Sequence, residues 1–185
     1  MKLWLVRHAA PEVAPGICYG KTDVPALTEH TRRLAGELAS ALPAHVALQV
    51  SPLARCAAAA KALHAARPDV PPRTDPRLAE MDFGSWEGRP WDAIGREAMD
   101  AWMRDFARHA PGGGEPVHAF MQRVAAAYDE TVLAARDCAW ITHAGVIRAA
   151  LLLQQGQRTV SSADQWPAAA IGFGQWIVLE IPGPR

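Results

Sequence analysis

Short apolar segments that end abruptly at polar residues constrain the fold of this chain more than any other feature. Residues 2–6 form one such segment and are followed at once by Arg7 and His8. Residues 138–142 form another, which ends at His143. Apolar runs of this length are typical of strands buried inside a sheet. Because stretches with helical spacing of apolar residues lie between such runs, the sequence predicts an α/β fold.

The remaining segments extend this alternation of strands and helices. Leu34, Leu38 and Leu42 mark one helical face after Thr28, which is a candidate N-cap. Residues 9–26 contain three Pro and two Gly and are expected to form a long loop. We expect strands at residues 2–6, 46–50, 70–78, 138–142 and 176–181, and helices at residues 28–42, 53–66, 91–108, 117–131 and 146–153. The expected architecture is one domain over residues 1–185, with a mostly parallel central sheet and helices on both faces.

The charge balance narrows the classes of partner. Lys and Arg number 19, as do Asp and Glu, so the formal net charge is zero at pH 7. A protein dedicated to nucleic acid or to an anionic membrane carries a basic excess, so we expect neither partner. Sixteen of the 19 basic residues are Arg, whose forked donors suit phosphate and carboxylate groups.

Cysteine usage and the N-terminal segment predict the compartment. The three cysteines, Cys18, Cys56 and Cys138, are widely spaced and lack the spacing of a zinc site. We expect them to be buried or free thiols in a reducing compartment. The N-terminal apolar segment is too short for a signal peptide, and no apolar run reaches membrane-spanning length. These features together predict a cytoplasmic location.

Two of the seven histidines occupy equivalent places, since His8 and His143 each follow a predicted strand directly. Ligands of open α/β sheets bind beyond the carboxyl ends of the strands, so these imidazoles predict a site. The tripeptide Arg7-His8-Ala9 recurs as Arg108-His109-Ala110. No apolar strand precedes the second copy, so only His8 is a candidate.

Arginines and carboxylates complete this predicted site. Arg7 precedes His8, and Arg55 follows the second predicted strand in the segment Ser51-Pro-Leu-Ala-Arg55. Guanidinium groups beside two imidazoles form a cationic pocket that suits a phosphoryl group. A carboxylic acid would protonate the departing oxygen, and the candidates are Glu80, Asp82 and Glu87. Other phosphate chemistries lack their motifs: there is no Cys-x₅-Arg, Asp-x-Asp, His-x-His or GxxxxGK.

Four motifs in this chain together resemble the histidine phosphatase (phosphoglycerate mutase-like) superfamily. They are Arg7-His8, Ser51-Pro-Leu-x-Arg55, Arg77-Leu-x-Glu80-x-x-Phe-Gly-x-Trp-Glu-Gly and Thr142-His143-x-Gly-Val-Ile-Arg. They follow the family's order from residue 3 to about residue 150, which makes the set far more specific than any one motif. The resemblance implies the phosphoglycerate mutase-like fold and a phosphatase that needs neither a cofactor nor a metal.

The resemblance also implies a role for each candidate side chain. His8 would be the nucleophile that is transiently phosphorylated, and Arg7, Arg55 and His143 would hold the phosphoryl group. Glu80 would protonate the leaving alkoxide and then activate water. Asp82 and Glu87 would have supporting roles, with Glu87 bracing the loop around Trp86. The family usually has Gly at the position of Ala9 and often Thr at that of Ala59, and these departures concern substrate fit more than chemistry.

Residues 18–24, Cys-Tyr-Gly-Lys-Thr-Asp-Val, are similar to the α-ribazole phosphatases of cobalamin biosynthesis. Those enzymes remove the 5′-phosphate from α-ribazole 5′-phosphate or the corresponding cobamide phosphate. The similarity makes Cys18, Tyr19, Lys21 and Thr22 the expected substrate contacts. The other interpretation of this segment is a tight loop that carries no information about the substrate.

Three alternative functions stay open behind this one. A broad-specificity phosphatase of small phosphate esters is the first. A phosphoglycerate mutase is less favoured, because the 63 positions from Glu80 to His143 leave little room for the lid that a mutase needs. A non-catalytic protein that binds phosphorylated ligands is least favoured, because His8, Glu80 and His143 are all present. The expected partner is a small phosphate ester, and the chain could form a homodimer.

Overall fold

The computed structural model describes residues 1–168 and 171–182, in which five strands form one sheet in the order β3-β2-β4-β1-β5. These strands are β1 (Lys2–Arg7), β2 (Ala47–Val50), β3 (Pro72–Thr74), β4 (Cys138–Thr142) and β5 (Trp176–Glu180). Strands β1 to β4 pair in parallel, and β5 runs antiparallel to β1 at the edge. The mostly parallel sheet expected from the sequence is therefore confirmed.

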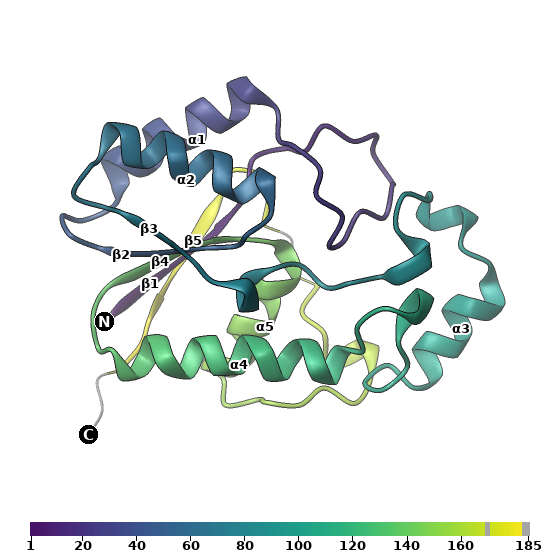
Figure 1. Cartoon of the computed structure of the whole chain (residues 1–185). Helices are drawn as coiled ribbons and strands as arrows, with labels where there is room; N and C mark the ends of the chain where they lie inside the picture. The colour runs from purple at the N-terminus through teal and green to yellow at the C-terminus, as the bar shows by residue number, and fades with distance from the viewer. Residues whose placement is uncertain (169–170, 183–185) are drawn as a thin grey trace.

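Helices cover both faces of this sheet, as predicted (Figure 1). On one face lie α1 (Thr28–Ala41) and α2 (Ala54–Ala66), and on the other lie α4 (Val117–Leu133) and α5 (Ala144–Gln154). A shorter helix, α3 (Arg96–Arg104), lies away from the sheet, beyond one end of it (Figure 1).

The side chains of β1 show how the two-residue period of a strand builds two cores. Trp4 and Val6 pack in the cluster that includes α1 and α2. Leu3 and Leu5 pack in the cluster that includes α4 and α5. Burial on both faces explains why this segment is apolar throughout.

The register between β1 and β4 sets the position of the site. These strands pair from Leu3 opposite Cys138 to Arg7 opposite Thr142. Just beyond, the backbone N–H of His8 donates to the carbonyl of Thr142 over 3.0 Å. Because two adjacent parallel strands end at the same level, the residues that follow them leave the sheet side by side.

Two element predictions were too long. The strand expected at residues 70–78 is limited to β3, because a 3₁₀ turn begins at Pro76 and the Asp75 side chain caps it by accepting from the backbone N–H of Arg77. The helix expected at residues 91–108 consists of a 3₁₀ turn over residues 91–93, followed after Gly95 by α3.

The N-cap prediction was also wrong, because Thr28 is the first helical residue of α1 and Leu27 occupies the cap position. The long loop at residues 9–26 is confirmed, with isolated bridges only. The three cysteines are buried free thiols, and burial raises the pKa of each to about 12. Within the described residues, no helix is long and apolar enough to cross a membrane.

Candidate active site

His8 and His143 lie next to each other at the carboxyl ends of β1 and β4. Their ring centroids are 5.1 Å apart, and the rings are inclined by 58°. Both side chains are almost fully buried, with 1% and 0% of their surface exposed. The structure therefore brings together the two histidines that the strand-end argument singled out. His109 of the repeated tripeptide lies after α3, outside this pair.

The ring of His8 presents its Nε2 lone pair. Its Nδ1 lies 2.7 Å from the carbonyl oxygen of Ala9 and must donate to it, because a carbonyl only accepts. Burial and the nearby charge of Arg55 lower the pKa of His8 to about 3, so the ring is neutral at pH 7. A neutral imidazole protonated at Nδ1 carries its free electron pair on Nε2. His8 thus has the electronic form that a nucleophile needs.

His143 is held on both sides of its ring. Arg55 Nε donates to His143 Nδ1 over 3.3 Å, so Nε2 carries the proton and donates to Ser51 Oγ at 2.7 Å. Burial, followed by the charge of Arg55, lowers the pKa of His143 well below its ordinary value. His143 is therefore a neutral imidazole whose hydrogen bonds are already satisfied by protein groups.

Arg55 is fully buried beside His143 and anchors the loop that carries the α-ribazole phosphatase-like segment. Its Nη1 donates to the Thr22 carbonyl at 2.8 Å, and its Nη2 donates to the Gly20 carbonyl at 2.6 Å. Three of the five N–H donors of this guanidinium are thereby used, and the other two have no partner among residues 1–168 and 171–182. The sequence argument placed Arg55 near the histidines and missed its contacts to this loop.

Arg7 lies near His8 and makes contacts of its own. Its guanidinium carbon is 3.8 Å from the centre of the Phe173 ring, and its Nη1 donates to the Ile171 carbonyl at 2.6 Å. Its Nε is buried and has no hydrogen-bond partner within the described part of the chain. A buried donor without a partner is costly, which favours a polar ligand here.

Glu80 is placed by the first turn of α5. The backbone N–H of Gly145 donates to Glu80 Oε2 over 3.1 Å, and that of Met81 donates to Oε1 over the same distance. A β-carbon at Gly145 would overlap Glu80 Oε1, so the carboxylate can keep this position only beside a glycine. This close approach explains in physical terms the glycine of the Thr-His-x-Gly motif.

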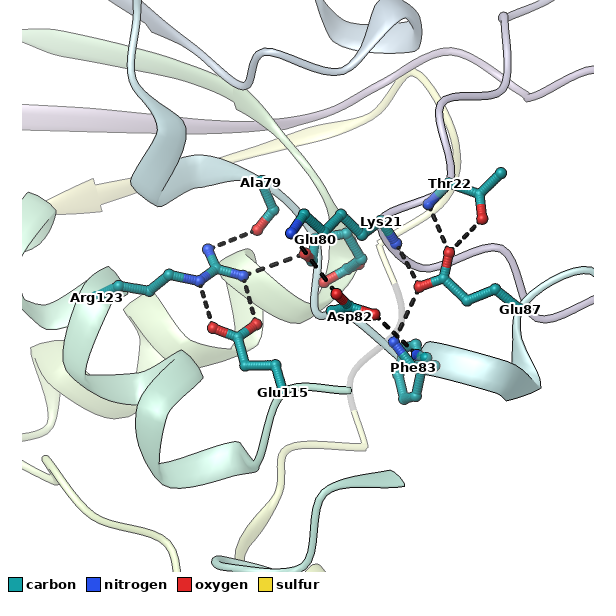
Figure 2. A network of polar contacts seen from close by, with 10 residues as sticks. Lys21, Thr22, Ala79, Glu80, Asp82, Phe83, Glu87, Glu115 and Arg123 are labelled. Atoms are coloured by element: carbon teal, nitrogen blue, oxygen red, sulfur yellow. Dashed lines mark hydrogen bonds and ion pairs between the residues drawn. The ribbon is translucent and has the colours of Figure 1, made fainter. Parts of the chain in front are cut away.

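The other two carboxylates have different surroundings (Figure 2). Asp82 accepts from the backbone N–H of Gly84 and pairs with Lys21 at 3.6 Å. Glu87 accepts from the backbone N–H groups of Lys21, Thr22 and Phe83, and from the Thr22 hydroxyl. Glu87 therefore ties the loop of residues 21–22 to the loop of residues 83–87.

A cavity of about 610 Å³ opens beside His8. Arg7, His8 and Glu80 line it, whereas Arg55, His143 and the carboxylates of Asp82 and Glu87 lie outside its described lining. Aromatic side chains form much of the remaining wall. They are Phe83, Trp91, Trp102, Phe106, Phe120 and Trp166, whereas Phe173 lies beside His8 and Arg7.

The four expected substrate contacts do not lie together. Tyr19 lines the cavity, with its ring 6.5 Å from that of His8. Cys18 is buried behind it, Lys21 is exposed and paired with Asp82, and Thr22 is bound to Glu87. The structure thus places one of the four at the cavity.

The sequence argument missed the aromatic wall. Trp91 and Trp166 come from segments outside the regular helices and strands, where no periodicity marks a side chain as buried or exposed. One signal was available. Phe83 and Trp166 lie outside the predicted helices and strands, and large aromatic residues in such segments often line binding sites. Trp91, Trp102 and Phe106 fall within the helix predicted at residues 91–108, so this signal does not apply to them.

The fold and these side chains define the class of the protein. A histidine at the end of the first parallel strand, a second histidine on its neighbour, two arginines and a carboxylate are the side chains that the four motifs of this family lead one to expect. The sequence model of the histidine phosphatase superfamily (branch 1) matches residues 3–171. The chain belongs to this superfamily, and it is a phosphatase.

Individual relatives narrow the comparison. The chain is similar to an adenosylcobalamin/alpha-ribazole phosphatase of Salmonella typhimurium, at 31% identity over 98% of this chain and 91% of that protein. A protein of the same description from Escherichia coli K12 is 32% identical over 67% of this chain and 63% of its own length.

Solved structures share the fold. A protein from Thermus thermophilus described as a phosphoglycerate mutase is 29% identical, with a TM-score of 0.71 over 99% of this chain and 95% of that chain. The mycobacterial glucosyl-3-phosphoglycerate phosphatase has a TM-score of 0.78 at 23% identity, covering 96% of this chain and 88% of that chain. The expected phosphoglycerate mutase-like fold is confirmed.

Proposed function

We propose that this phosphatase hydrolyses phosphate monoesters through a phosphohistidine on His8, and that its substrate is α-ribazole 5′-phosphate. The observation that carries the proposal is a neutral His8, free at Nε2, that lines one cavity together with Arg7 and the Glu80 carboxylate. Nucleophile, positive charge and proton donor are the three parts that such a reaction needs.

The first half-reaction forms the phosphoenzyme. The Nε2 lone pair of His8 attacks phosphorus, the bond from phosphorus to the ester oxygen breaks, and the protonated Glu80 carboxyl gives its proton to that oxygen. The alcohol leaves with this proton. An alkoxide is a poor leaving group, so this proton transfer lowers the barrier.

The second half-reaction releases phosphate. Water attacks phosphorus, the bond between phosphorus and Nε2 breaks, and the Glu80 carboxylate accepts the proton of the water. His8 recovers its lone pair and Glu80 recovers its proton, so the cycle is balanced without another reactant.

Arg7, Arg55 and His143 bind the transferring phosphoryl oxygens in this proposal. Arg7 does so directly, because it lines the cavity and its Nε lacks a partner within the described residues. Arg55 keeps two unused N–H donors for this purpose. His143 must exchange its contact with Ser51 or with Arg55 for a phosphoryl oxygen, because both of its ring nitrogens are occupied.

Three observations support α-ribazole 5′-phosphate as the substrate. The relatives above are described as adenosylcobalamin/alpha-ribazole phosphatases. A cavity of about 610 Å³ accommodates far more than a phosphoryl group. The aromatic wall offers ring faces for a flat, apolar leaving group.

A broad-specificity phosphatase is the second candidate. One observation favours it: of the four predicted substrate contacts, only Tyr19 lines the cavity. A pocket that selects mainly by apolar surface discriminates weakly between ligands of similar shape. We further propose that the protein acts in the cytoplasm, without nucleic acid, and that it could form a homodimer.

A comparison of substrates in EDTA tests the proposal. We expect kcat/KM for α-ribazole 5′-phosphate to exceed that for 3-phosphoglycerate and glycerol phosphate by about 10² or more, as large ring contacts allow. Activity should survive EDTA, because no step uses a metal. Equal values for all esters would favour the broad-specificity enzyme, and mutase activity or loss of activity in EDTA would overturn the proposal.

A further inference from the structure

The segment that carries Glu80 has no regular secondary structure to hold it. Residues 79–82 follow a 3₁₀ turn and belong to neither helix nor strand. Buried carbonyl groups that take no part in the hydrogen bonds of a helix or sheet need other donors. Where these carbonyls find donors therefore decides how firmly the segment, and Glu80 with it, is positioned.

One side chain of α4 supplies most of these donors (Figure 2). Arg123 Nη1 donates to the carbonyls of Arg77 and Ala79, both at 2.7 Å. Its Nη2 donates to the carbonyl of Glu80 at 3.1 Å. Three carbonyls within four residues thus converge on a single guanidinium.

Glu115 holds this guanidinium from the other side. Its carboxylate accepts from Arg123 Nε at 2.7 Å and from Nη2 at 2.8 Å, in the paired geometry that Arg favours. The backbone N–H of Glu115 donates to the Asp82 carbonyl at 2.7 Å, which fixes the other end of the Glu80 segment. Figure 2 shows the two side chains facing each other beside this segment.

Arg123 contributes little to the anchoring of its own helix. Helix α4 is docked by apolar side chains, among them the fully buried Phe120 and Val124. The guanidinium lies 4.6 Å from the Phe120 ring and points to the Glu80 segment. Loss of Arg123 should therefore leave the helix in place and release the carbonyls that it binds.

We propose that Arg123, held by Glu115, is the positioning residue for the general acid Glu80. This rests on the proposed function, in which Glu80 gives a proton to the leaving oxygen. Arg123 fixes the main chain at Glu80, and the Gly145 N–H fixes its carboxylate, so the acid is held at both ends. A displacement of about 1 Å at a catalytic group can cost about 10² in rate, and this fixation prevents it.

The test uses leaving groups that differ in their need for a proton. A sugar 5-phosphate releases a basic alkoxide, whereas p-nitrophenyl phosphate releases a stable anion that needs little help. We expect Arg123→Met to lower kcat/KM, which reports formation of the phosphoenzyme and not the later attack of water, at least tenfold on the sugar phosphate and less than threefold on p-nitrophenyl phosphate. Arg123→Lys keeps the charge without the planar fork and should give an intermediate, equally selective loss.

Glu80→Gln separates the two proposals. If Glu80→Gln shows the selective loss and Arg123→Met slows both substrates equally, the positioning role is wrong and the acid assignment stands. If Glu80→Gln shows no selectivity, the acid assignment fails and the positioning role fails with it. In the Glu80→Gln background, Arg123→Met should add no further selective loss, and additive effects would overturn the proposal.

Arg158→Met is the matched control. Arg158 also binds a carboxylate of α4, through Asp129, but this pair is exposed and far from the cavity lining. Arg158→Met should therefore leave the rates on both substrates unchanged. If Arg123→Met does not fold, Glu115→Gln replaces it, because it weakens the grip on Arg123 and leaves every carbonyl its donor. Glu115→Gln should also slow the sugar phosphate more than p-nitrophenyl phosphate, but by a smaller factor. An equal loss on both substrates would count against the proposal.

Discussion

The two ends of the cavity are formed by different structural elements. At the phosphate end, His8 and His143 follow adjacent parallel strands, and backbone or buried side-chain contacts fix each ring. At the other end, the aromatic wall comes from α3, α4, 3₁₀ turns and connecting segments. Under the proposed function, the carboxyl edge of the sheet positions the reacting groups and the aromatic wall contacts the leaving group. One end can vary without disturbing the other, which is how a fold comes to serve several substrates.

The largest effect should come from the nucleophile at the phosphate end. We expect His8→Ala to lower kcat on every ester by about 10⁴ or more, because no other group forms the covalent intermediate. Steady-state assays on p-nitrophenyl phosphate and α-ribazole 5′-phosphate check this. His109→Ala, which changes the repeated tripeptide, should retain full activity. If His8→Ala keeps more than a tenth of the rate, the chemistry does not belong to this end of the cavity.

Arg55→Lys should cause a smaller loss of activity than His8→Ala. A lysine cannot supply the separate contacts that Arg55 makes to His143, Thr22 and Gly20, although it keeps the charge. We expect kcat/KM to fall by about 10²–10³ on all esters, the cost of losing a preorganised donor. Arg67→Lys is the control, since Arg67 binds three carbonyls far from the cavity. Wild-type activity in Arg55→Lys would remove Arg55 from the phosphate end.

Acid should lower the free energy of unfolding of the protein, because His8 at the phosphate end is buried without charge. The pKa of His8 is about 3 in the folded protein and near 6.5 in the unfolded chain, so below pH 6.5 the unfolded chain binds a proton that the folded protein excludes. The free energy of unfolding should fall as the pH drops from about 6.5 toward 3, by at most ~1.4 kcal/mol per pH unit for this ring. Above pH 6.5 this contribution is constant.

Urea unfolding of wild type and His8→Gln between pH 4 and pH 8 measures this effect, because the difference between the two curves removes the contribution of the carboxylates. As the pH falls, the free energy of unfolding of the wild type should decrease relative to that of His8→Gln, because the variant carries no buried imidazole at position 8. Parallel curves would contradict a neutral, buried His8.

The smallest effect should come from the aromatic end. Trp91 is 37% exposed and contacts Phe83 edge to face, so Trp91→Leu should fold normally. We expect up to about tenfold lower kcat/KM on α-ribazole 5′-phosphate, the value of an aromatic contact, and no change on glycerol phosphate. An equal loss on both esters would show that the two ends are not independent.

The phosphate end could largely be predicted from the sequence, and the reason is physical. Apolar segments that end at Arg7-His8 and at His143 are strands, and parallel strands end at one edge of a sheet. The contacts of Arg55 and His143 with each other could not be predicted, because they depend on side-chain directions that no pattern encodes. Their position behind the cavity lining is known only from the structure.

The aromatic end and Arg123 escaped prediction for other reasons. The wall combines aromatic side chains from Phe83 to Phe106 with Phe120 and Trp166, and only tertiary packing brings such distant segments together. Arg123 lies in an amphipathic helix, where an arginine is ordinarily a solvated residue. Its partners are main-chain carbonyls, which leave no trace in the sequence.

Covalent labelling tests the central claim most directly. The enzyme is mixed with a ³²P-labelled ester, quenched within milliseconds and digested, and the labelled peptide is sequenced. We predict an acid-labile, base-stable label on His8, formed at least as fast as the enzyme turns over. A label on His143, or full turnover with no labelled histidine, would contradict the account.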